Sequence, residues 1–128
     1  MRFTCVTFAA VLVCLAVTTI RGDDGDKKTQ SYWMKKKLEY SQNILSGLAT
    51  EDFTAIRANA TSMKALDVLE KYIHPRTNEY RMQLQTFQFA NDELIRNARE
   101  KNIDGAALAY VQLTLSCVNC HKVLRSSR

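Results

Sequence analysis

Long stretches without helix breakers constrain the fold of this chain more than any other feature of its sequence. Its 128 residues include one proline, Pro75, and four glycines. Because proline and glycine most disfavour the interior of a helix, their scarcity favours long uninterrupted helices. The length is sufficient for one domain built around one hydrophobic core. No stretch has the alternating pattern that is typical of a strand.

Four stretches place apolar residues three or four positions apart, which is the spacing of one helical face. They predict helices over 32–48, 52–71, 79–100 and 105–125. The predicted inward-facing residues are Met34, Leu38, Ser41, Leu45 and Leu48, with Ile44 beside them; Phe53, Ile56, Ala60, Met63 and Leu66; Tyr80, Leu84, Phe87, Asn91, Leu94 and Ala98, with Phe89 and Ile95 beside them; and Leu108, Val111, Leu115 and Val118. Asp104 is the expected N-cap of the fourth helix.

The breaks between these segments are short, so consecutive helices should lie side by side and antiparallel. The predicted fold class is all-α, an antiparallel up-down-up-down four-helix bundle. In that order the start of the first helix lies beside the end of the fourth. The turn from Trp33 to Leu38 should therefore lie opposite residues 117–121.

The first 22 residues have the composition of a secretory signal peptide. Arg2 gives a positive start, residues 6–20 are uncharged and largely apolar, and Asp23 marks the change to polar sequence. Residues 23–30 predict a flexible lead-in before the bundle domain, residues 31–128. The expected location is the periplasm, with an uncleaved membrane anchor as the alternative. The cleavage site stays open.

Residues 117–121 read Cys-Val-Asn-Cys-His, the C-x-x-C-H spacing that is typical of covalent haem attachment. Three positions span most of a helical turn, so both thiols face the same way. Cys117 and Cys120 would form thioethers with the haem vinyl groups, and His121 would be the proximal iron ligand. The expected cofactor is one covalent haem c.

The cysteine count agrees with this interpretation, because the other two cysteines, Cys5 and Cys14, lie in the leader. Two alternatives are open, a redox dithiol and a structural zinc site. A thioredoxin-type dithiol follows a strand, and no strand is predicted. A zinc site needs a fourth ligand besides the three motif residues, and His74 is the only other histidine.

The charge of the chain argues against a nucleic-acid partner. The formal net charge is +5, and it falls to +3 without residues 1–22, because Arg2 and Arg21 lie there with no acidic residue. The only basic run, Lys35 to Lys37, is interpreted as a solvated helix face. No serine–histidine–aspartate set or glycine-rich phosphate loop is present, so we expect no enzyme and no catalytic residues.

Together these features resemble the cytochrome c′ family of four-helix-bundle monohaem cytochromes. The resemblance rests on the bundle pattern, the motif near the C-terminus, the basic residue Arg125 four places after His121, and the segment Ile56-Arg57-Ala58-Asn59-Ala60. It implies a haem pocket with Trp33, Leu38 and Arg125 as candidate members. Arg125 would pair with a haem propionate.

The family has two branches, and the resemblance leaves both open. In one, a methionine early in the first helix is the sixth iron ligand and the protein carries single electrons; Met34 stands at that place. In the other, the iron is five-coordinate and binds nitric oxide or carbon monoxide, and Leu38 would then close the distal side. The expected partners are redox proteins and small gases, and the chain is a monomer or a homodimer. Family members often dimerise through their first two helices.

Overall fold

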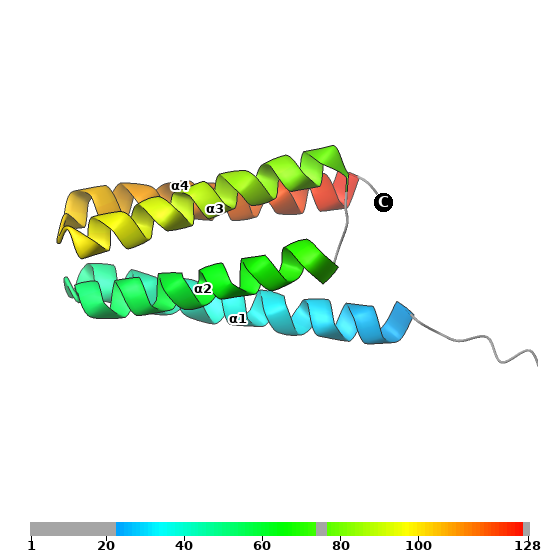
Figure 1. Cartoon of the computed structure of the whole chain (residues 1–128), viewed down its shortest axis with the longest axis horizontal. Coiled ribbons are helices and arrows are strands. Elements are labelled where there is room, and N and C mark those ends of the chain that lie inside the picture. The colour runs from blue at the N-terminus through cyan, green and yellow to red at the C-terminus, as the bar shows by residue number, and fades with distance from the viewer. Residues whose placement is uncertain (1–22, 74–76, 127–128) are drawn as a thin grey trace, which may run out of the picture.

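The computed structural model describes residues 23–73 and 77–126, and the side chains of residues 31–69 and 77–126. Four helices account for almost all of this part of the chain: α1 Asp23–Ala49, α2 Phe53–Ile73, α3 Asn78–Arg99 and α4 Ile103–Ser126. They alternate in direction and pack lengthwise, α1 on α2, α2 on α3 and α3 on α4 (Figure 1). The predicted all-α four-helix bundle is therefore confirmed.

Side-chain caps start α2 and α3. The backbone N–H of Ala55 donates to Asp52 Oδ1 at 2.9 Å, and that of Tyr80 donates to Thr77 Oγ1 at 3.3 Å. Each bond satisfies one of the backbone donors that a helix leaves free at its first turn.

The predicted start of α4 is wrong by two residues. The N–H of Gly105 donates to the Asn102 side-chain oxygen at 3.0 Å, so Asn102 is the cap and α4 begins at Ile103. Asp104 lies instead in the first turn, where its negative charge interacts favourably with the helix dipole.

The start of α1 also differs from the expectation. Residues 23–30, expected as a flexible lead-in, are helical, and α1 begins at Asp23. Acidic residues occur at positions 23, 24 and 26, and such residues are favoured at helix N-termini. The apolar stripe begins only near residue 33, which is why periodicity did not find these first turns.

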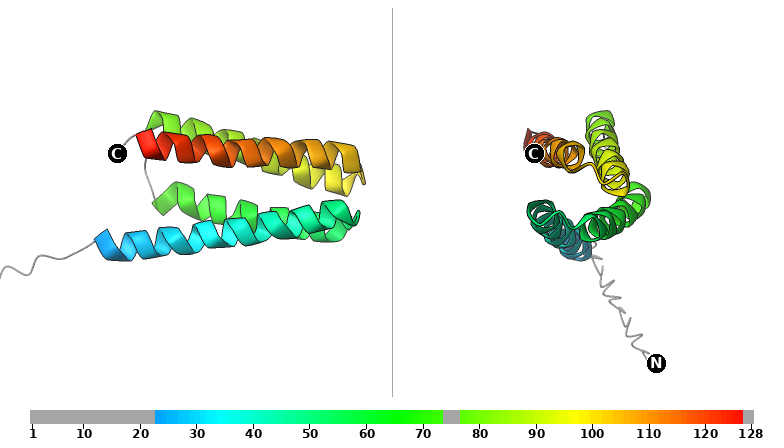
Figure 2. Two further views of the ribbon diagram at one scale, coloured as in Figure 1. Left: turned by 180° about the vertical axis from the view of Figure 1, so that it is seen from behind. Right: turned by 90° about the vertical axis from the view of Figure 1, so that its left-hand side faces the viewer.

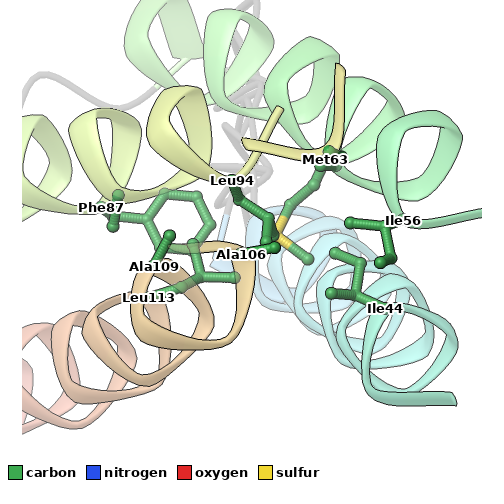
Figure 3. Close-up of a cluster of buried hydrophobic side chains, with 11 residues drawn as sticks. Ile44, Ile56, Met63, Phe87, Leu94, Ala106, Ala109 and Leu113 are labelled. Atoms are coloured by element: carbon green, nitrogen blue, oxygen red, sulfur yellow. The ribbon is translucent and has the colours of Figure 1, made fainter. Parts of the chain in front are cut away.

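The apolar core cluster links all four helices and consists of Ile44, Ile56, Ala60, Met63, Phe87, Ala90, Leu94, Ala98, Ala106, Ala109 and Leu113. Figure 3 shows Met63 reaching from α2 toward Leu94 and Ala106, between the Ile44–Ile56 group and the Phe87–Leu113 group. Burial of these side chains is the main stabilising term of the bundle.

The predicted inward face of α3 is confirmed, since Tyr80, Leu84, Phe87, Asn91, Leu94 and Ala98 are all buried. Phe89, expected beside that face, is exposed instead, because it lies on the opposite side of the helix. Asn91, the one polar residue of the face, donates from Nδ2 to the Ala60 carbonyl of α2 at 2.9 Å. A buried amide is tolerated where it has such a partner.

The predicted inward face of α4 is wrong. Leu108, Val111, Leu115 and Val118 are exposed, and the buried face of α4 consists of Ala106, Ala109, Leu113 and Ser116. Small residues on that face let α3 and α4 approach closely. Both the exposed and the buried side of α4 carry apolar residues at helical spacing. The prediction from spacing chose the side with the larger residues, which is the exposed one.

The inward face of α1 is rotated by about one residue from the prediction. Ile44 is completely buried, whereas Leu38 and Leu45 are exposed. Lys37 was expected in a solvated basic run. It lies seven residues before Ile44, which is close to two helical turns, and therefore on the same buried side of α1 as Ile44.

The four helices follow an arc with α1 and α4 at its two ends (Figure 2, right). These two helices touch each other least of the four neighbouring pairs. The α1–α2 hairpin and the α3–α4 hairpin diverge toward the end of the bundle where α1 begins and α4 ends (Figures 1 and 2). We call this the motif end, because residues 117–121 lie in the last turns of α4.

Candidate functional site

One polar contact sets how α1 lies against α4. Tyr110 Oη lies 3.0 Å from Ser41 Oγ and donates to the Ser41 carbonyl at 3.1 Å. The two helices are antiparallel. A residue that precedes Ser41 on α1 therefore lies at the same level along the bundle axis as the residue that follows Tyr110 on α4 by the same number of positions. Met34 is seven positions before Ser41 and Cys117 is seven positions after Tyr110. Both therefore lie at the same height, about 10 Å from the contact toward the motif end.

Of the motif side chains, Cys117, Cys120 and His121 lie on the sides of α4 toward α1 and the bundle interior, and Cys117 and His121 are exposed. Seven residues are close to two full turns, so Cys117 projects on the same side of α4 as Tyr110, toward α1. His121, eleven residues after Tyr110, projects on that side as well. Cys120, eleven residues after the buried Ala109, lies on the interior side and is half-buried. Cys117 and Cys120 are not joined in a disulfide.

A buried ion pair lies beside the first motif cysteine. Lys37 Nζ of α1 is 2.8 Å from Asp67 Oδ1 of α2, and the two side chains are only 14% and 1% exposed. The same ammonium lies 4.8 Å from the centre of the Phe87 ring of α3, a cation–π distance. Lys37 thus reaches the bundle axis from α1 and meets two other helices there.

The charges of this pair extend to α4, where they act on the Cys117 thiol. The residue as a whole is exposed, but its thiol is screened from solvent, and this burial raises the pKa of Cys117. The Lys37 ammonium acts in the opposite direction and Asp67 in the same direction as burial. Four helices therefore contribute to one polar centre, at the height where the apolar core cluster ends.

Beyond this centre, toward the motif end, the interior changes character. Tyr80 and Leu84 are buried there but lie outside the core cluster, and Ser116 is buried with its hydroxyl donating to the Leu113 carbonyl at 2.6 Å. Among the described side chains, residues 31–69 and 77–126, the apolar core cluster thus does not extend into the motif half of the bundle.

Trp33 adds an unsatisfied donor to this half. Its indole Nε1 is buried and has no hydrogen-bond partner among the described residues, while its ring contacts Tyr32 edge-on with centroids 5.0 Å apart. Trp33 lies eleven residues before Ile44, so it faces the interior. A buried N–H without an acceptor is costly, and it suits a site whose ligand supplies the acceptor.

The other predicted site residues lie as follows. Met34 is half-buried on the α4-facing side of α1. Leu38 is exposed one turn further along, and Arg125 is exposed in the last turn of α4. The structure therefore gathers Trp33, Met34 and the motif around the motif end, and it leaves Arg125 at the rim.

The sequence interpretation missed Lys37, Asp67, Ser116 and Tyr110. Spacing could have found the ion pair, because Lys37 lies seven residues before Ile44 and Asp67 lies four after Met63. A charged residue in phase with an apolar stripe on each of two neighbouring helices is a signal for a buried pair.

The residues of the motif end fit a covalently held haem. Two thiols lie three positions apart on α4, exposed at Cys117 and half-buried at Cys120, and the buried Trp33 indole N–H lacks an acceptor among the described residues. A haem would supply apolar surface to that interior and propionate acceptors to buried donors. Among the described residues, no three His, Cys, Asp or Glu side chains are grouped so that they could hold a metal ion directly.

Comparisons with protein families, with curated proteins and with solved structures found no match to this chain. Within residues 23–73 and 77–126, none of the helices combines the length and the apolar character that a bilayer span requires.

Proposed function

We propose that this chain is an exported, periplasmic c-type cytochrome that carries single electrons. The observation that supports it best is the position of the C-x-x-C-H motif. It lies in the last turns of α4, beyond the apolar core cluster that the described residues form. Cys120 is half-buried on the interior side, and exposed Cys117 and His121 lie on the side toward α1, where half-buried Met34 stands at the same level as Cys117.

Each residue has a defined role in this proposal. Cys117 and Cys120 hold the haem through thioethers, His121 is the proximal ligand, and Met34 is the distal ligand. The Trp33 indole donates to a propionate from inside, and Arg125 pairs with one at the rim. When bound, the haem supplies a one-electron ferric–ferrous couple. Met34 as the second protein ligand would favour the reduced state of that couple.

The alternative is a five-coordinate protein that binds nitric oxide or carbon monoxide. One observation favours it: α1 and α4 touch each other least, and exposed Leu38 lies on that flank, so a small ligand would have a short path inward. In this alternative Met34 packs against the haem without binding iron.

The first test is an absorption spectrum of the purified, exported protein, recorded oxidised, reduced, and reduced with carbon monoxide. Low-spin bands that carbon monoxide does not shift support the electron carrier. A high-spin spectrum that shifts with carbon monoxide supports the gas-binding alternative. A colourless protein from a host competent in haem attachment would exclude both, and metal and thiol analysis would then separate zinc from a dithiol.

The Met34→Ala variant tests the distal ligand. We expect it to convert the iron from low spin to high spin and to make it bind carbon monoxide, because the thioether is gone and alanine cannot ligate. Met82→Ala on the exposed side of α3 is the matched control, and its spectrum should equal that of the wild type. An unchanged low-spin spectrum in Met34→Ala would exclude Met34 as the ligand.

A further inference from the structure

The outward side of α4 carries a regular line of residues that the fold leaves uncovered. Leu108, Val111, Leu115 and Val118 are 63%, 54%, 56% and 45% exposed and follow one another at steps of three, four and three. We call these four residues the outer seam. This is the a/d spacing of a coiled-coil helix, and it lies opposite the buried face of Ala106, Ala109 and Leu113.

The outer seam lacks the charges of an ordinary solvent-facing helix. Between Asp104 and Lys122, α4 contains no acidic side chain and no lysine or arginine. Amphipathic helices of soluble proteins usually place such charges opposite their buried face, so this side has the composition of a second packing face.

The two ends of the seam are charged with opposite signs. Asp104 is four positions before Leu108 and Lys122 is four positions after Val118, and both are exposed. The order along this side of α4 is therefore acidic, four apolar residues, basic. It is symmetric about the midpoint between Val111 and Leu115.

We propose that two copies of this chain associate through the outer seam, with the two α4 helices antiparallel about a two-fold axis. In this arrangement Val111 faces Leu115 of the second copy, Leu108 faces Val118, and Asp104 faces Lys122. Each contact occurs twice, as a two-fold interface requires. A parallel arrangement would instead place Asp104 against Asp104 and Lys122 against Lys122.

The area agrees with a dimer interface of modest size. The outer seam and its flanking residues span about 27 Å of helix. The four exposed side chains of the outer seam present on the order of 350 Å² of apolar area, about half of the roughly 800 Å² per partner of a standard interface, so we expect a weak, reversible dimer. This interface differs from the one that the family resemblance implies, which is formed by the first two helices.

Sedimentation velocity of the mature protein over a concentration series tests this proposal. Reductant is included so that Cys117 and Cys120 cannot link two chains. We expect a reversible dimer for the wild type and a monomer at every concentration for Leu115→Asp, because the charge would be buried without a partner. Leu69→Asp, at an exposed apolar position of α2 outside the outer seam, is the matched control and should still dimerise.

Charge exchange tests the antiparallel order without touching apolar packing. Asp104→Lys and Lys122→Asp should each weaken dimerisation about tenfold at low salt, since each replaces two attractive end contacts by repulsive ones. The double variant D104K/K122D should recover the wild-type dissociation constant. Helical circular dichroism of each variant verifies folding.

Three results of the sedimentation experiments would overturn the proposal. They are a wild-type protein that stays monomeric at hundreds of micromolar, a dimer that persists in Leu115→Asp, and single charge variants that dimerise as well as the wild type. Binding of wild-type monomers to phospholipid vesicles through the same residues would also overturn it, in favour of a membrane surface. The outcome does not depend on haem attachment, because the outer seam lies on a different side of α4 from the thiols of Cys117 and Cys120.

Discussion

Lys37 connects the helices of this bundle at the scale of single residues. It pairs with Asp67 of α2, lies over Phe87 of α3 and affects the thiol of Cys117 on α4. In this buried position a carboxylate and an aromatic face take the place of the water that the Lys37 ammonium has lost. Replacing either partner of the pair alone would leave the other charge buried without compensation.

The pH dependence of Cys117 alkylation follows from these neighbours. Only the thiolate reacts, so in the haem-free Cys120→Ser variant the alkylation rate should have its midpoint above about 8.5, the ordinary thiol value. Lys37→Met should move this midpoint further up, because it removes the charge that favours the thiolate. Asp67→Asn should move it down. Iodoacetamide labelling across pH measures all three.

The control for this experiment is Lys36→Met, since Lys36 is more exposed and pairs with Glu39 at 2.8 Å on the helix surface. Its labelling profile should equal that of the parent. A midpoint that does not respond to Lys37→Met would contradict the proximity of the two groups. The raised pKa of Cys117 also affects stability. The unfolded thiol ionises at lower pH than the folded one, so the free energy of unfolding of the haem-free protein should fall as pH rises through the pKa of the folded thiol.

At the scale of elements, the α1–α2 and α3–α4 connections use the same tight turn. Glu51 and Lys101 adopt φ of 53° and 54°, in the left-handed region. The following N–H groups close each turn five residues back, Asp52 to the Gly47 carbonyl at 2.9 Å and Asn102 to the Asn97 carbonyl at 3.0 Å. Such turns let the second helix of each hairpin pack against the first helix directly after the first helix ends.

Gly47 is the point of closest approach within the first hairpin. A Cβ atom there would lie 2.9 Å from Ile56 Cγ1 and 3.3 Å from the Asp52 carbonyl oxygen and the Ile56 nitrogen. Gly47→Ala should destabilise the fold by about 1–2 kcal/mol net, because the overlap with Ile56 Cγ1 and the two tight backbone contacts exceed the gain in helix propensity. Denaturant unfolding measures the change.

Ser46→Ala, at the exposed neighbouring position, is the matched control for Gly47→Ala and should stay within about 0.5 kcal/mol of the wild type. A Gly47→Ala variant that unfolds at higher denaturant concentration than the parent would mean that α1 and α2 can separate there at no cost.

At the scale of the whole molecule, the bundle consists of two unequal halves. The half near the two tight turns contains the apolar core cluster, whereas the motif half contains the Lys37–Asp67 pair, the Trp33 donor and diverging hairpins. Burial of apolar area stabilises the first half by itself. In the proposed cytochrome, the second half depends on its cofactor for comparable stability.

Amide hydrogen exchange of the haem-free double variant C117S/C120S, compared with the haem-loaded wild type, tests this division. Amides near Met63, Leu94 and Ala109 should be protected in both proteins. Amides of residues 31–37 and 117–124 should exchange roughly tenfold faster or more in the haem-free variant. Equal protection of both halves without haem would contradict the division.

Spacing and composition predicted the number of helices, their order and most of the inward face of α3. These features are local, because periodicity acts within a few residues. Spacing failed on α4, where Leu108 to Val118 and Ala106 to Leu113 form two apolar faces and the larger one is exposed. It also failed at Lys37, whose burial depends on Asp67, thirty residues away.

The sequence by itself determined an all-α bundle and a C-x-x-C-H motif, because helix breakers, caps and residue spacing need no information from distant parts of the chain. Only the tertiary structure decided which side of α1 and α4 faces inward and that Lys37, Asp67, Phe87 and Cys117 share one centre. The physical reason is that close packing selects the small face of α4, and a buried charge is tolerated only where a partner from another helix meets it.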